Sequence, residues 1–166
     1  MDASDNKARQ GEQRARELWE TGLQHLMEGD VFSAVDHFNL SLKVRPTAEG
    51  YTYRGWAISF LGQWEEAITD CKRAIDLDPD FGNPYNDIGV YLMHLGLLDQ
   101  AVPWLEKAKS ARRYEPKHFP YLNLGHVYMA MGDPGRALGE YVQALELDPE
   151  NDVARKAIAG MELRSQ

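Results

Sequence analysis

The sequence predicts an all-α fold in which antiparallel helix pairs stack on one another, and three features of its 166 residues predict it. The chain repeats itself, with blocks that begin at residues 15, 48, 82 and 118 and share the same glycine positions. Apolar residues recur at helical spacing within each block, as in Ile68, Cys71 and Ile75. Each block ends near a proline, which cannot continue a helix. Every block is therefore predicted to be a helical hairpin.

Six columns of residues align across the four blocks. The glycines at the eighth place are Gly22, Gly55, Gly89 and Gly125. The glycines seven residues later are Gly29, Gly62, Gly96 and Gly132. The alanines five residues further on are Ala34, Ala67, Ala101 and Ala137. Apolar residues follow at Phe38, Cys71, Leu105 and Tyr141, and small residues at Ser41, Ala74, Ala108 and Ala144. The closing prolines are Pro46, Pro79, Pro116 and Pro149.

These columns have a physical meaning in a helix pair. The eighth-place glycine removes a side chain where two helices must approach closely, and the alanine column does the same from the second helix. The second glycine can adopt the left-handed conformation that ends a helix with little strain. It is therefore expected to separate the first helix of each block from the second.

Prolines and caps mark several helix starts. Pro84 and Pro120 are expected to open the first helices of their blocks, because a proline at the first turn loses no helical hydrogen bond. Asp133 and Pro134 are expected to be the N-cap and first residue of the last block's second helix. Only Pro103 falls inside a predicted helix, near its first turn, where we expect a kink and not a break.

The chain is expected to have three parts. These are a charged extension at 1–14 that is helical or partly disordered, the four blocks at 15–47, 48–81, 82–117 and 118–151, and a capping helix and tail at 152–166. In the last part Asp152 is available as an N-cap, and apolar side chains gather on one side of the helix, as stacks of this kind require at their ends. The initial methionine and this end helix suggest a complete chain.

The columns resemble the tetratricopeptide repeat, a pattern of about 34 residues with small and apolar residues at fixed places. The last block matches it best, at Tyr121, Leu124, Gly125, Tyr128, Ala137, Tyr141, Ala144 and Pro149. The resemblance covers residues 15–151 and implies four repeats with a C-terminal capping helix. It also implies an α-solenoid, a right-handed superhelical stack of antiparallel helix pairs whose first helices line a concave face.

The third block departs from this pattern by carrying about three extra residues between Ala108 and Pro116, in the run KSARRYEP. We expect the second helix of that block to be longer by almost one turn. The insertion is either neutral or widens the groove locally, and the residues alone leave both alternatives open.

The resemblance implies which residues face a peptide-binding groove. They are Trp19, Leu23, Met27, Tyr53, Trp56, Phe60, Asn86, Asp87, Val90, His94, Leu122, Asn123 and His126. The same rule also places Glu20, Thr52, Met93, Phe119 and Met129 inward. Aromatic rings and methionine suit the anchoring of a partner's side chains. Asn86 and Asn123 could hydrogen-bond the main chain of an extended peptide. Alternatively, the aromatic residues form core between repeats, or a terminal segment occupies the groove.

Composition and charge narrow the partners. The formal net charge of −8 argues against nucleic acid, because affinity for phosphates comes from Lys and Arg. No apolar run is long enough to span a membrane, and the single cysteine fits a reducing, cytoplasmic location. In relatives that clamp the acidic C-termini of chaperones, basic residues stand at fixed inward places. Here those places hold no Lys or Arg, and Asp87 would repel a carboxylate, so we expect no such clamp.

The sequence contains no phosphate-binding glycine loop and no nucleophile motif, so we predict no enzyme, no cofactor and no metal. Cys71 is expected to be buried and unreactive. A remote alternative is a metal or acid-base site at His94 and His126, two inward positions on adjacent first helices. The principal prediction is a scaffold, an adaptor or assembly chaperone, that binds a peptide or helical segment of a partner protein. Its rival is a self-associating module, such as a homodimer.

Overall fold

The computed structural model describes residues 3–164, and over these residues the protein consists of nine α-helices. The helices are α1 (Ala3–Met27), α2 (Val31–Val44), α3 (Ala48–Ser59), α4 (Trp64–Leu77), α5 (Asn83–His94), α6 (Leu98–Ser110), α7 (Phe119–Ala130), α8 (Pro134–Leu147) and α9 (Asp152–Arg164). Within the same residues the single β-type contact is an isolated bridge between Phe81 and Arg113. The predicted all-α class is confirmed.

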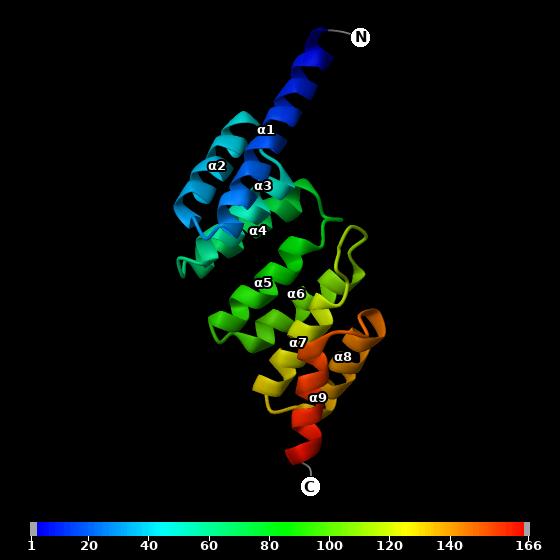
Figure 1. Ribbon diagram of the computed structural model, residues 1–166. Helices are drawn as coiled ribbons and strands as arrows, with labels where there is room; N and C mark the ends of the chain where they lie inside the picture. The colour runs from blue at the N-terminus through cyan, green and yellow to red at the C-terminus, as the bar shows by residue number, and fades with distance from the viewer. Residues whose placement is uncertain (1–2, 165–166) are drawn as a thin grey trace.

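The helices pack as four consecutive hairpins, α1 with α2, α3 with α4, α5 with α6 and α7 with α8, and α9 packs on α8. The hairpins follow one another along an elongated stack with the two ends of the chain at opposite ends (Figure 1). The first helices of successive hairpins also contact one another, α1 with α3, α3 with α5 and α5 with α7. These contacts place the first helices in a row, which forms one face of the solenoid.

The eighth-place glycines lie where the two helices of each hairpin meet. A β-carbon at Gly89 would lie 2.5 Å from the Leu105 side chain, and one at Gly22 would lie 2.7 Å from the Phe38 ring. The Tyr141 ring packs against Gly125 in the same way. The apolar column opposite these glycines is buried to 2% exposure or less in every hairpin. The steric role predicted for the glycine column is confirmed.

The second glycine column ends the first helix of each hairpin, as predicted. Gly29, Gly62, Gly96 and Gly132 have φ angles of 83°, 75°, 74° and 77°. A side chain at such a φ angle would be strained, so glycine is the preferred residue. Asp133 then caps α8, its carboxylate accepting a hydrogen bond from the Arg136 amide at 3.0 Å.

The prediction of a longer second helix in the third block is wrong. Helix α6 continues across Pro103 but ends at Ser110, and the extra residues form a loop that reaches back to the preceding hairpin. The Arg113 amide donates to the Asp80 carbonyl at 3.0 Å, and the Gly82 amide donates to the Arg113 carbonyl at 2.9 Å. The loop therefore satisfies its backbone groups against residues 80–82, which replaces the hydrogen bonds that another helical turn would have supplied.

The side chain of Arg113 extends these contacts. Its guanidinium donates to Glu49 at 3.0 Å and to Asp78 at 2.5 Å, and it lies 4.2 Å from the centre of the Phe81 ring. Tyr114 is buried to 6% exposure and packs against Gly82, where a β-carbon would collide with it. The loop is thus tied to the second hairpin by charge, by packing and by main-chain hydrogen bonds.

The two ends of the chain differ in detail from the sequence-based expectation. Helix α1 begins at Ala3 and so includes most of the 1–14 extension, whose first two residues lie outside the described part. At the other end the side chain that caps α9 belongs to Asn151, which accepts from the Ala154 amide at 3.1 Å, and Asp152 is already the first helical residue. Ala154 is fully buried, so α9 covers the end of the core.

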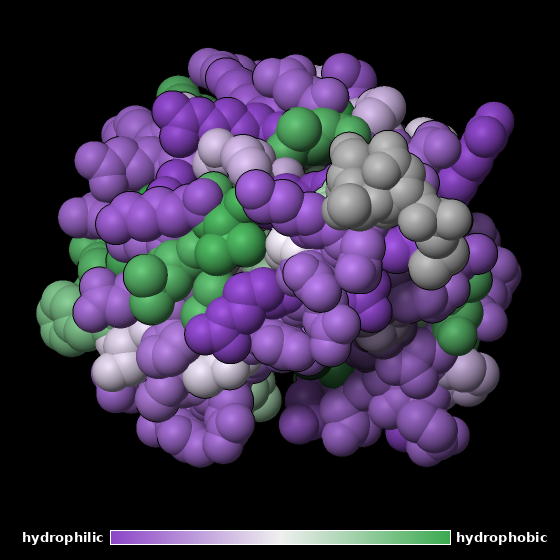
Figure 2. Space-filling view, turned by 90° about the horizontal axis from the view of Figure 1, so that it is seen from above, coloured by the Kyte–Doolittle hydropathy of each residue, from purple (hydrophilic) through white to green (hydrophobic). Residues whose placement is uncertain are grey.

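Seen from the N-terminal end, the surface is mostly hydrophilic, with hydrophobic side chains in smaller groups between the polar ones (Figure 2). Across residues 3–164, no helix combines the length and the apolar character needed to span a membrane.

We predict that Gly89→Ala lowers the free energy of unfolding by about 1–3 kcal/mol, because the added carbon overlaps the Leu105 side chain in a packed core. Gly139→Ala is the matched control. Gly139 also lies inside a helix, α8, but nothing lies within 4 Å of the position of its missing β-carbon. That substitution should stabilise the protein by up to about 1 kcal/mol through helix propensity. Urea unfolding followed by circular dichroism measures both, and equal effects would contradict the steric role.

Candidate functional site

Two adjoining pockets open on the face formed by the first helices. The central pocket has a volume of about 400 Å³ and lies between α3, α5, the loop after α6 and the start of α7. Its lining residues are Thr52, Tyr53, Trp56, Asn83, Asn86, Asp87, Tyr114, Glu115, Pro116 and Phe119. Tyr53, Trp56, Asn86 and Asp87, which the sequence predicted to share a groove, therefore line one pocket.

The adjoining pocket has a volume of about 530 Å³ and continues along α3 and α5. Its lining residues are Trp56, Ser59, Phe60, Gly62, Trp64, Asp87, Val90, Tyr91 and His94. Trp56 and Asp87 line both pockets, so the two form neighbouring parts of one groove. Phe60, Val90 and His94 are thus brought to this groove as well.

The aromatic residues of the groove divide into packed and exposed ones. The Trp19 and Tyr53 rings lie 5.2 Å apart, and both are partly buried against the core between the first two hairpins, together with Leu23 and Trp56. Phe60 is 60% exposed, and its ring lies 5.9 Å from that of Trp56. Part of the aromatic stripe is therefore core between repeats, which was one of the two alternatives, and part is free to meet a ligand.

The two asparagines of the groove bind each other. The Asn123 side-chain amide donates to the Asn86 side-chain oxygen at 2.8 Å, and Asn86 is only 8% exposed. Asn86 is therefore committed to joining α5 to α7. Asn123 is half-buried and keeps its own side-chain oxygen for another donor.

The remaining predicted residues lie in different surroundings. Leu122 is 4% exposed and belongs to the core, whereas Met27 is 77% exposed at the end of α1. The His94 ring stacks on Trp64 of α4 at 4.3 Å, while His126 meets the edge of Tyr141 of α8 at 5.7 Å. The two histidines are thus packed on different second helices. Among residues 3–164 no cluster of three or more metal-binding side chains is present.

Asp87 is the most unusual polar group in the groove. In the part of the chain that the structure describes, its carboxylate is in no ion pair, and its one hydrogen bond is a long contact of 3.5 Å from Asn86. Burial raises the pKa of Asp87 to about 7. The groove therefore holds a carboxyl group whose charge is poorly compensated by the protein itself.

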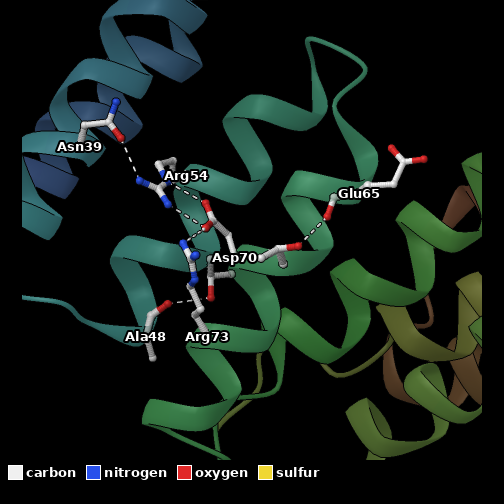
Figure 3. A network of polar contacts seen from close by, with 8 residues as sticks. Asn39, Ala48, Arg54, Glu65, Asp70 and Arg73 are labelled. Atoms are coloured by element: carbon white, nitrogen blue, oxygen red, sulfur yellow. Dashed lines mark hydrogen bonds and ion pairs between the residues drawn. The ribbon is translucent and has the colours of Figure 1, made fainter.

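The buried carboxylate of Asp70, in contrast, has its charge compensated by a guanidinium of the same protein. Asp70 on α4 is 3% exposed and accepts two hydrogen bonds of 2.7 Å from the guanidinium of Arg54, which also donates to Asn39 at 2.9 Å (Figure 3). Arg54 projects from α3 towards α2 and α4, while its neighbour Tyr53 lines the groove. This network joins three helices and holds α3 in place behind the groove.

Sequence reasoning missed the contribution of the loop after α6. Tyr114, Glu115 and Pro116 line the central pocket although they belong to no first helix. The signal was present, since the run KSARRYEP interrupts the repeat and its partner Gly82 stands directly before α5. The insertion shapes the groove, and it does so as a wall and not as a longer helix.

Cys71 is fully buried, as predicted. Burial raises the pKa of its thiol well above the ordinary value, which leaves it as the unreactive neutral form.

Comparisons with known proteins give consistent results. Family models described as "Tetratricopeptide repeat" match residues 48–81, 83–114 and 118–151, which together make up more than half of the chain. The chain is 24% identical over 147 residues to the "Small glutamine-rich tetratricopeptide repeat-containing protein 2" of Mycosarcoma maydis, a match that covers 88% of this chain and 32% of that protein. It is 32% identical over 83 residues to "Tetratricopeptide repeat protein 6" of Homo sapiens, covering 50% of this chain and 16% of that one. The chain thus spans about a third or less of the length of these relatives.

Solved structures share the fold. The Pseudomonas aeruginosa pilF structure superposes with a TM-score of 0.88 at 18% identity and covers 93% of this chain and 70% of that one. The first repeat domain of Spaghetti (RPAP3), bound to the HSP90 peptide SRMEEVD, superposes with a TM-score of 0.67 at 24% identity, covering 72% of this chain and 97% of that one. Identities at this level show a common fold and nothing finer.

We predict that Asp87→Asn makes the protein more stable at pH 8. Because the pKa of about 7 in the folded state lies above the ordinary aspartate pKa of 3.8, the folded protein keeps a proton that the unfolded chain has lost. The free energy of unfolding of the wild type should therefore fall as the pH rises from about 4 to about 7, and the variant should lack this component. After allowance for solvent screening, the gain is about 1–2 kcal/mol.

Urea unfolding at pH 4, 6 and 8 measures this difference. Asp76→Asn removes an equal charge at an exposed position of α4 and serves as the control for the loss of one charge. Parallel pH profiles for wild type and Asp87→Asn would contradict the effect assigned to Asp87.

Proposed function

Because the chain belongs to the tetratricopeptide repeat family, we propose that it is a non-enzymatic scaffold that holds a segment of another protein in the groove formed by its central and adjoining pockets. The observation that carries this proposal is the pair of pockets on the face of the first helices, lined by aromatic side chains and by few charged ones. Concave sites with apolar walls and a few polar groups are typical of ligand binding.

Exposed rings supply the binding energy in this proposal. Phe60 and Phe119 are 60% and 43% exposed and stand at different parts of the groove, with Trp56 between the two pockets. Burying such rings removes apolar surface from water at a low cost in side-chain entropy, and they commonly anchor interfaces. A bound segment would run along α3 and α5, with side chains in both pockets, and Asn123 would offer it a hydrogen bond.

The wider role proposed is that of an adaptor or assembly chaperone in the cytoplasm. The peptide held by the first repeat domain of Spaghetti supports the general mode, because that domain shares the fold. The ligand itself is expected to differ. An acidic chain terminus would meet Asp87 and Glu115 in the central pocket, where no Lys, Arg or His lines the wall.

Self-association remains the second candidate function. Phe32 on α2 is 74% exposed, and Leu40 and Val44 on the same helix are 47% and 45% exposed, so an apolar surface exists outside the groove. A second copy could cover it. Sedimentation equilibrium over a hundredfold range of concentration separates this candidate from a monomeric scaffold.

The groove proposal is tested with peptides selected from a displayed random library against the wild-type protein. Phe60→Ala should weaken the selected peptides about tenfold or more, which is the loss expected from truncating a central aromatic anchor. Phe32→Ala is the matched control, since it removes the same ring from an exposed position on a second helix. Peptides that tolerate both substitutions equally would place the binding site elsewhere.

A further inference from the structure

We propose that the central pocket is a receptor for a cationic side chain, a lysine or an arginine of the bound segment, held against the Asp87 carboxylate between aromatic rings. This inference rests on the proposed function and adds the chemistry of the ligand. It follows from three properties of the pocket, which are a carboxylate without an ion pair, aromatic rings without a Lys or Arg over them, and a lining without Lys, Arg or His.

The carboxylate is the first argument. Asp70 is buried and Asp87 is half-buried, yet only Asp70 has a guanidinium from the protein, Arg54, at two distances of 2.7 Å. No described Lys, Arg or His comes within ion-pair distance of Asp87. A carboxylate left without a cation in such surroundings carries a desolvation cost, which a cation from outside would offset.

The basic residues beside the pocket lining have partners other than Asp87. Arg113 precedes Tyr114, but its guanidinium is bound to Glu49 and Asp78 and lies over the Phe81 ring. His118, next to Phe119, faces Asp148 at 3.7 Å. The His118 ring also lies 4.6 Å from the Phe119 ring, and Lys117 lies 3.9 Å from Glu115. None of these groups is paired with Asp87, so its cation is left to the ligand.

Aromatic rings are the second argument. The walls of the pocket include Tyr53, Trp56, Tyr114 and Phe119. The faces of such rings attract cations, and the protein uses this attraction elsewhere, since Lys109 lies 4.6 Å from the Tyr121 ring and Arg136 lies 4.4 Å from the Tyr128 ring. Within the described residues no Lys or Arg lies over any of the four pocket rings.

The third argument is the overall composition of the wall. Besides the rings it offers oxygen acceptors from Asn83, Asp87 and Glu115, of which Glu115 lies 3.9 Å from the Lys117 ammonium, and no Lys, Arg or His is among its lining residues. The net charge of −8 adds a long-range attraction for a basic segment. The high pKa of Asp87 agrees with this assignment, because a bound cation would favour the ionised carboxylate that burial disfavours.

The volume of the central pocket is also large enough for a long basic side chain. A volume of about 400 Å³ falls in the range of roughly 300–1,000 Å³ that binding pockets occupy, and the pocket is continuous with the adjoining one past Trp56 and Asp87. A long basic side chain can therefore enter the central pocket while an apolar side chain of the same segment meets Phe60.

The test uses peptides selected on the wild-type protein and varied one residue at a time. The expected result is a shared Lys or Arg at one peptide position, whose replacement by Gln weakens binding to the wild type about tenfold or more. Against Asp87→Asn the same replacement should change affinity less than twofold, because the partner charge is gone. Asp76→Asn, with the same loss of charge on an exposed face of α4, should behave as the wild type.

The outcomes separate this inference from the proposed function. Selected peptides that depend on Phe60 but show no basic residue, or whose Lys-to-Gln loss is equal in wild type and Asp87→Asn, would overturn the cation receptor and leave the groove proposal standing. Peptides that ignore Phe60, or a selection that yields none, would overturn both. The replacement made in the peptide leaves the protein unchanged, so the first result does not depend on the folding of a variant.

Discussion

The close approach of the two helices in each hairpin, made possible by a glycine on the first helix, is the contact on which the rest of this structure depends. Gly22 faces Phe38, Gly89 faces Leu105 and Gly125 faces Tyr141. This contact buries one face of the first helix, and the neighbouring hairpins cover its two flanks. The remaining face is therefore left for the groove. The packing that builds the stack therefore also determines which side chains a ligand can reach.

Much of this follows from the sequence, because the packing contact is local and repeats at a fixed period. The glycine, alanine and apolar columns predict the helix pairs and the turns at Gly29 and Gly132, and the resemblance to the tetratricopeptide repeat implies the row of first helices. The same columns explain why Tyr53, Trp56 and Asp87 meet in one pocket, since they stand at corresponding faces of adjacent first helices.

The features that the sequence could not predict depend on contacts between distant segments. The loop after α6 is held by Arg113, whose guanidinium donates to Glu49, 64 positions earlier in the chain, and no periodicity encodes such a pair. Leu122 is buried because neighbouring helices cover it, whereas a rule based on one repeat treats it as open. Whether Asn151 or Asp152 caps α9 depends on a one-residue difference in where the helix begins, which is the least predictable property of a helix.

The loop after α6 also has a mechanical consequence. A solenoid behaves as a spring, because each repeat touches only its neighbours and small rotations add along the axis. Between the second and third hairpins the attachment of Arg113 to Asp78 and Glu49, with Tyr114 seated on Gly82, adds a brace across one of these joints. The stack of hairpins is therefore stiffened at its middle, directly beside the central pocket. The other joints are held by side-chain hydrogen bonds, such as those from Arg54 to Asn39 and from Asn123 to Asn86, so bending under load should be smallest beside the central pocket, which keeps its shape.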